Sequence, residues 1–136
     1  MGKFLKVFGS PLPKQRTPKV PEALKSEISS KAQQLVEHHL KPAHVEQPEN
    51  PQCNYVADIY TKWHERHFYF CATYIAFIPG AVSRAFEVPF ARMGYLGSGK
   101  FNLAYMAQTG KWCKMYPCLS IDKCLEAVRD EPHFIP

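Results

Sequence analysis

The apolar residues change their period along the chain, and these changes limit the folds that the chain can adopt. From residue 54 onward, apolar and polar side chains alternate in short runs separated by turn residues. In the first run, NYVADIYTKW, the side chains of Tyr55, Ile59 and Trp63 fall on one face, and the other face is more polar. A period of two is typical of β-strands, and short turns between such strands predict an antiparallel meander.

The later runs predict three or four further strands. HFYFCATYIAF is apolar on both faces, which predicts a central strand buried on both sides. A loop from Pro79 to Pro89 then leads into FARMGYL, and a GSGK turn leads into FNLAYMAQ. A second turn at Thr109-Gly110 precedes KWCKMY, the last expected strand.

Two helices flank these strands. A first helix is predicted over 21–41, and Pro42 is expected to end it. Its apolar residues recur at close to helical spacing: Leu24, Ile28, Leu35, Val36 and Leu40. Ser120 is a good N-cap for a second helix over Ile121–Asp130.

The predicted fold class is therefore α+β. It is an antiparallel β-meander of four or five strands with an N-terminal and a C-terminal helix, preceded by an extended, basic, Pro-rich arm. The expected divisions are an arm at 1–20, a helix at 21–41, a Pro-rich linker at 42–53 and a small α+β domain at 54–136.

The arm holds the net charge of the protein. The chain carries a formal charge of +5, and its first 25 residues contain six basic residues against the single acid Glu22. The remaining residues, 26–136, contain 11 basic and 11 acidic side chains. Four prolines stiffen the same segment. A cationic, proline-stiffened arm on a neutral, aromatic-rich body suggests a protein that docks onto something larger.

Membrane and secretion signals are not expected. The longest apolar stretch, YIAFIPGAV, is far shorter than the roughly 20 residues of a membrane-spanning helix, and the N-terminus lacks the apolar segment of a secretory signal. The five cysteines are irregularly spaced and lack the pairing of a zinc site. Free thiols in a reducing compartment are expected, with no metal and no cofactor.

Two short motifs resemble known sites but predict turns. GYLGSGKF fits a phosphate-binding loop through Gly94, Gly99 and Lys100, yet Phe101 stands where Ser or Thr binds magnesium, and a strand pattern follows. HERH spaces its histidines three apart, whereas a zinc-protease helix needs four. We expect a hairpin turn and a polar turn.

Two further patterns, the RHFYFCATY stretch and the cysteine–histidine pairs, establish neither RNA binding nor catalysis. RHFYFCATY resembles an RNA-recognition strand through Arg66, Phe68 and Phe70, but core aromatics are the favoured interpretation. Cys71 with His67 is one conceivable nucleophile and base, and nothing selects that pair. We expect no catalytic residues and no enzyme activity.

The predicted partner-binding residues combine the cations and aromatics of the arm with two arginines of the body. Arg84 and Arg92, flanked by Phe86 and Phe90, extend the docking surface in this interpretation. The full set is Lys3, Phe4, Lys6, Phe8, Lys14, Arg16, Lys19, Arg84 and Arg92. RNA, anionic lipid headgroups and acidic protein faces all remain possible targets of the arm.

The stretch from FARMGYL to the acidic DEPHF close resembles small uncharacterised proteins of bacteria, plants and algae that are grouped as a domain of unknown function. The resemblance covers about residues 54–136 and is carried by Arg92, Trp112, Leu119, Leu125, Asp130 and Pro132. It implies no activity and no catalytic residues. A basic arm added to such a module would suit a subunit recruited into an organellar assembly.

The first functional hypothesis is a non-catalytic accessory subunit of a large assembly, most plausibly a mitochondrial respiratory-chain complex. Its partners would be other protein subunits, and its location would be mitochondrial or otherwise cytoplasmic, not secreted. The alternative is a mitoribosomal protein whose arm contacts RNA, and a small enzyme is the third hypothesis.

Overall fold

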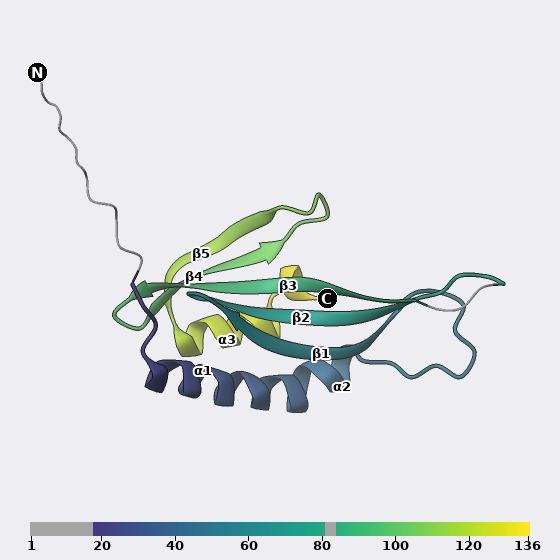
Figure 1. Ribbon diagram of the computed structural model, residues 1–136, viewed down its shortest axis with the longest axis horizontal. Coiled ribbons are helices and arrows are strands. Elements are labelled where there is room, and N and C mark those ends of the chain that lie inside the picture. Colours follow the sequence, from purple (N-terminus) through teal and green to yellow (C-terminus); the bar gives the residue numbers. More distant parts are fainter. Residues whose placement is uncertain (1–17, 81–83) are drawn as a thin grey trace, which may run out of the picture.

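The structure, a computed structural model shown in Figure 1, describes residues 18–80 and 84–136. Its elements follow one another in this order: α1 (Glu22–Leu35), a π-helical turn (Val36–Leu40), α2 (Lys41–His44), β1 (Tyr55–His64), β2 (His67–Ala76), β3 (Arg84–Gly97), β4 (Lys100–Met106), β5 (Trp112–Ser120), α3 (Ile121–Asp130) and a 3-10 turn (Pro132–Phe134).

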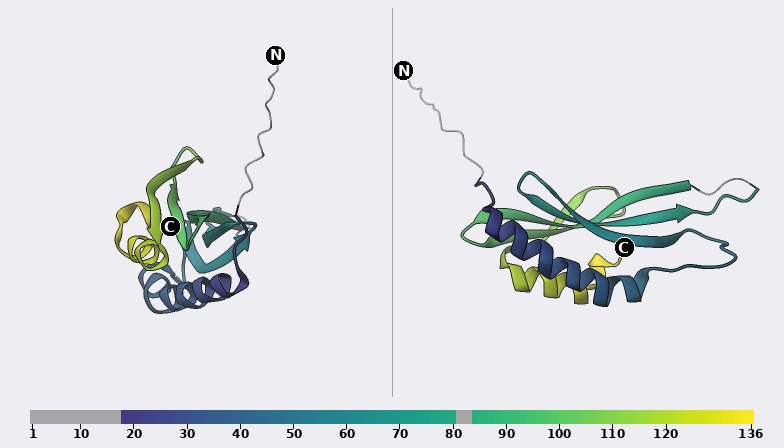
Figure 2. Two further views of the ribbon diagram at one scale, coloured as in Figure 1. Left: turned by 90° about the vertical axis from the view of Figure 1, so that its left-hand side faces the viewer. Right: turned by 60° about the horizontal axis from the view of Figure 1, so that its bottom comes forward.

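The five strands form one antiparallel sheet in which each strand pairs with the next along the chain. The helical segments α1, α2 and α3 lie on the same face of this sheet (Figures 1 and 2). The predicted α+β fold, an antiparallel meander with a helix at each end, is confirmed. We call the other face of the sheet the open face.

The hydrophobic core lies between the helices and the covered face of the sheet. α1 contributes its predicted apolar stripe, in which Ile28 is fully buried, and β2 contributes Phe68 and Phe70. A hydrogen bond of 3.1 Å from Trp63 Nε1 to Ser29 Oγ joins β1 to α1. The leading helix and the sheet therefore share one core.

The expectation that β2 is buried on both faces holds at Cys71, which is 1% exposed, but not along the rest of the strand. Phe68 and Phe70 point into the core, whereas His67, Tyr69 and Thr73 on the open face are only partly buried. The described helices cover one side of the strand, so the second apolar face of β2 is available for another role.

Pro42 does not end the first helix, contrary to prediction. The hydrogen-bond ladder widens just before it, because the Lys41 N–H donates to Val36 O in the π register. The Val45 N–H then donates to Lys41 O at 2.9 Å, which closes α2. Pro42 is the second residue of α2 and directly follows this widened turn, which accommodates a residue without an N–H inside a continuous helical segment. The helix therefore reaches His44, and the Pro-rich linker begins later than predicted.

Two further prolines lie inside strands. β3 begins at Arg84, within the expected loop, and contains Pro89, while β5 continues through Pro117 to Ser120. Pro89 lies at a register shift in the pairing of β2 with β3, and Pro117 lies in an irregular stretch of the edge strand β5. Bulges and edges leave N–H groups unpaired, so both positions accept proline.

The predicted turns and the helix cap are confirmed. HERH forms the turn between β1 and β2, with Glu65 at φ 56°. Ser98 and Gly99 connect β3 to β4 with φ values of 54° and 72°, as in a type I′ turn, and a strand follows. Ser120 Oγ accepts the Lys123 N–H at 3.3 Å and caps α3.

The sheet is strongly curved, and its open face is concave (Figure 2). Two strands separate β2 from β5, so a flat sheet would hold them roughly 14 Å apart. The ring centroids of Tyr69 on β2 and Trp112 on β5 are nevertheless only 5.9 Å apart. Curvature therefore brings side chains from β2 and β5 together on the open face.

Candidate functional site

The open face contains a cavity of about 300 Å³, which we call the basic cavity. Its wall comes from the turn between β1 and β2 and from strands β2 to β5. The charged, polar and aromatic side chains that line it are Arg66, His67, Arg92, Asn102, Trp112 and Lys114. No carboxylate from the described residues belongs to this lining.

Both arginines of the basic cavity are held in place. Arg66 Nη1 donates to Tyr95 O at 3.0 Å, and Tyr95 N donates back to Arg66 O at 3.0 Å. The Arg92 guanidinium carbon lies 4.6 Å from the centroid of the Trp112 ring, a cation–π contact. Register explains this convergence, because Arg92 pairs with Tyr69 and Tyr69 packs on Trp112.

Gly94 makes room for the imidazole of His67, its partner across the β2–β3 pair. A Cβ atom at position 94 would lie 3.2 Å from His67 Cδ2 and 3.3 Å from His67 Nε2. Contacts this short would push the ring away. The glycine therefore lets the imidazole pack closely against β3 in the lining of the basic cavity.

The environment of His67 favours its neutral form. Burial, followed by the positive charges of Arg92 and Arg66, holds the pKa of the imidazole below its ordinary value of 6.5, against a smaller opposite effect of Glu65. Neutral imidazole can donate from one nitrogen and accept at the other. The basic cavity thus holds the basic side chains of Arg66, Arg92 and Lys114 together with a histidine whose neutral form is favoured.

Charge is unevenly distributed between the helices and the sheet. Each basic residue of the helical segments lies within 4.0 Å of a carboxylate: Lys25, Lys31, Lys41, Lys123 and Arg129. The described part of the sheet forms no such ion pair through its own basic residues. Residues 55–120 contain seven basic and three acidic side chains. Of these acids, Asp58 pairs with Lys41 and Glu87 accepts from Tyr60.

A family model for a domain of unknown function, DUF3024, matches residues 20–136. The chain belongs to the DUF3024 family. The predicted resemblance to a domain of unknown function is confirmed, and the match extends further toward the N-terminus, to include α1. Neither the comparison with curated proteins nor that with solved structures found a match.

The predicted partner-binding residues are only partly brought together. Arg92 lines the basic cavity of the DUF3024 domain, but Arg84 lies at the far end of β3 and is exposed. Phe86 is exposed and stacks on Tyr74, whereas Phe90 is 5% exposed and belongs to the core, so Phe90 cannot contribute to a docking surface.

Most predicted arm residues lie outside the described residues: Lys3, Phe4, Lys6, Phe8, Lys14 and Arg16. Lys19 is described and exposed, next to the buried Val20. Lys19 and Val20 border a hollow of about 550 Å³ that Arg66 also lines. Arg66 therefore belongs both to this hollow and to the basic cavity.

Sequence reasoning missed five of the charged, polar and aromatic members of the basic cavity: Arg66, His67, Asn102, Trp112 and Lys114. One signal pointed toward them. In RHFYFCATY the core aromatics Phe68 and Phe70 alternate with His67 and Tyr69, which must face away from the core. The curvature that adds β5 to the same site has no comparable sequence signal.

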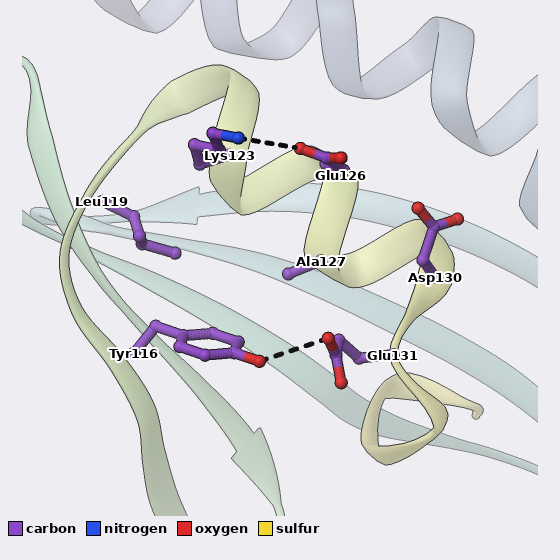
Figure 3. Close-up of a pocket in the computed structure, with 7 residues that line it drawn as sticks. All are labelled: Tyr116, Leu119, Lys123, Glu126, Ala127, Asp130 and Glu131. Carbon is purple, nitrogen blue, oxygen red and sulfur yellow. Dashed lines mark hydrogen bonds and ion pairs between the residues drawn. The ribbon is translucent and has the colours of Figure 1, made fainter.

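A second hollow, of about 240 Å³, lies between α3 and β5 (Figure 3). Its polar groups contact one another: Lys123 lies 3.6 Å from Glu126, and Tyr116 Oη donates to Glu131 at 3.2 Å. Asp130, also in its lining, accepts two hydrogen bonds from Arg129. The cations of the basic cavity have no carboxylate partner in the part of the chain that the structure describes, so this cavity is the stronger candidate site.

Cys71 and His67, the nucleophile and base considered from the sequence, lie in different surroundings. Cys71 and Cys124 are buried, and burial raises the pKa of both thiols, to about 12 for Cys124. Cys71 lies beside Tyr60 and Glu87, while His67 lies in the basic cavity. In the described residues no three His, Cys, Asp or Glu side chains are grouped for a metal, and no helix there has the length and apolarity to span a membrane.

Proposed function

We propose that this DUF3024 protein is a non-catalytic accessory subunit that docks onto an anionic surface of a large multiprotein assembly. Its contact surface combines the basic arm with the open face of the sheet. The observation that carries this proposal is the separation of charge. Among residues 18–80 and 84–136, the cations of the helices pair with carboxylates and those of the sheet do not.

The position of the arm supports the same surface. Val20 is 6% exposed and Pro18 approaches the β3–β4 turn at Gly97, so the base of the arm is attached to the body. Arg66, which borders the hollow beside Lys19, also lines the basic cavity. A partner that contacts the base of the arm would therefore lie beside the cations of the sheet, where complementary charge accelerates association.

The identity of the assembly stays a prediction. A mitochondrial respiratory-chain complex remains the expected assembly, because a Pro-stiffened arm suits a subunit that runs along its neighbour. The absence of enzyme activity likewise stays a prediction.

Crosslinking of the tagged protein within native assemblies tests the proposal. The design compares the full chain with a variant that lacks residues 1–17, which retains Pro18 and the buried Val20. It also compares Arg92→Glu on the open face with a matched charge reversal on the helical face, Lys31→Glu. We expect the full chain and Lys31→Glu to migrate with the assembly, and we expect arm lysines to crosslink to acidic segments of one neighbour.

Deletion of residues 1–17 and Arg92→Glu should each release the protein. Release by Lys31→Glu alone would place the docking surface on the helices and contradict the proposal. A chain that migrates as a free monomer in native extracts would also contradict it.

A second candidate, a mitoribosomal protein with an RNA-contacting arm, is favoured by the aromatic side chains of the open face. Tyr69 and Trp112 lie beside Arg92, and aromatic rings next to cations provide stacking positions for bases. Ribosomal RNA would then co-purify with the protein, and its recovery would fall steeply as salt rises. Recovery of protein neighbours without RNA would instead support docking on a protein assembly.

A further inference from the structure

We propose that the basic cavity binds the phosphate group of a small organic phosphate monoester. This inference concerns a ligand of the cavity and does not depend on docking to an assembly. It rests on the donors that converge there, on the way they are held, and on the size of the cavity.

The first argument is the number of donors and charges. Arg66, Arg92 and Lys114 enter the basic cavity from three different segments, without a carboxylate among the described lining residues. Like charges held near one another repel. A bound anion removes this repulsion, and a dianion with three terminal oxygens offers acceptors to several donors at once.

The second argument is that the donors are positioned before any ligand arrives. Tyr95 O holds Arg66, and the Trp112 ring holds Arg92. Asn102 Oδ1 accepts the Cys118 N–H at 3.2 Å, so the amide NH₂ of Asn102 remains as a donor. Groups fixed in this way lose little conformational entropy on binding, which favours affinity.

The third argument is shape. About 300 Å³ corresponds to roughly ten water molecules at about 30 Å³ each, which accommodates a phosphate with a small organic group. The Trp112 ring, which lines the cavity, provides an aromatic wall for that group. A polynucleotide would instead need a groove that follows its backbone over several nucleotides. A monoester also carries up to two negative charges on one phosphorus, whereas each phosphodiester carries one.

The test is a titration of the full chain in a buffer free of phosphate. The probes are adenosine 5′-monophosphate, inorganic phosphate, sulfate, succinate and a short RNA oligonucleotide without terminal phosphates. Binding is followed by calorimetry, by Trp112 fluorescence in a Trp63→Phe variant, and by the imidazole resonances of His67. We expect the monophosphate to bind more tightly than sulfate or succinate and to shift the His67 resonances.

Variants locate the site. Arg92→Gln and Lys114→Gln should each weaken monophosphate binding by about tenfold or more, because each removes a charge-assisted contact. Arg92→Lys keeps the charge but loses the planar fork, so we expect an intermediate loss. Lys62→Gln removes an exposed cation of the open face that lies outside the lining, and it should leave the affinity within about twofold. Thermal unfolding confirms that each variant is folded.

Several results would overturn the inference. Absence of binding at millimolar monophosphate would do so, as would equal affinity for sulfate and succinate, which would indicate non-selective anion attraction. Equal weakening by Lys62→Gln would show that the net charge of the face is responsible. Tighter binding of the RNA oligonucleotide would assign the face to a polynucleotide instead. Removal of residues 1–17 should leave the monophosphate affinity unchanged, which separates this result from the docking experiment.

Discussion

At the scale of single residues, the notable feature is a set of cations placed close together and held by neutral groups. Arg66 contacts a backbone carbonyl and Arg92 contacts an indole ring, so neither charge is neutralised by its partner. Neutral partners fix the position of a guanidinium and leave its charge available. His67 lines the same cavity as these two arginines, and the positive charge of each lowers its pKa.

The first prediction concerns the dependence of stability on pH. Burial and the neighbouring arginines hold the pKa of His67 below its ordinary value, and burial alone does so for His44. As pH falls below about 6.5, the unfolded chain takes up protons that the folded chain resists. The free energy of unfolding should therefore be highest above pH 6.5 and should decrease as the pH falls below that value.

Urea unfolding across this pH range measures the effect. His67→Gln should reduce the decrease, because it removes one of the titrating groups, and His38→Gln, on the exposed side of the π-helical turn, serves as the control. If the free energy of unfolding decreases as much in His67→Gln as in the unmodified chain, His67 does not contribute to the pH dependence of stability.

At the scale of elements, three prolines account for most errors in the predicted boundaries. Pro42, Pro89 and Pro117 were all expected to end an element or to lie outside one, and all three lie within helical or strand segments. The local rule holds in each case, since none removes a required hydrogen bond. The sequence does not show that a π turn, a bulge and an edge strand provide positions where the missing N–H of proline is not needed.

The second prediction concerns the hairpin that joins β3 and β4. Ser98 has φ 54° in a type I′ turn, a conformation that serine adopts at a cost and asparagine favours. Ser98→Asn should raise the free energy of unfolding by roughly 0.5 kcal/mol. Gly99→Ala, at φ 72°, should lower it by about 1 kcal/mol, because alanine is strained at positive φ. Denaturant midpoints that move in the opposite directions would contradict this turn geometry.

At the scale of the whole molecule, periodicity was enough to predict the meander, the helices and the burial of Phe68 and Phe70. It was not enough to predict the site. The basic cavity requires that β5 bend toward β2, and curvature depends on bulges and on packing between distant strands. The neutral total over residues 26–136 also concealed the separation of charge between helices and sheet. Only the three-dimensional arrangement shows which cations are paired.

The third prediction is that α1 and the sheet unfold as one cooperative unit. Ile28 on α1 is fully buried against the same core as Phe68, and Trp63 on β1 donates a hydrogen bond to Ser29. Ile28→Ala should lower the free energy of unfolding by about 2–4 kcal/mol through lost burial and the cavity that remains. Lys31→Gln, on the exposed side of α1, should change it by less than about 0.5 kcal/mol, although Lys31 bridges to Asp122.

Three probes of urea unfolding decide this prediction. Far-UV circular dichroism reports the helices, Trp63 fluorescence in a Trp112→Phe variant reports the contact between helix and sheet, and Trp112 fluorescence in Trp63→Phe reports the open face. One cooperative unit requires that all three transitions coincide, and that Ile28→Ala shifts them equally. A helical transition at lower urea than the Trp112 transition would show instead that α1 is an appendage of the sheet. Coincidence would mean that packing of α1 helps to maintain the curved sheet on which the basic cavity depends.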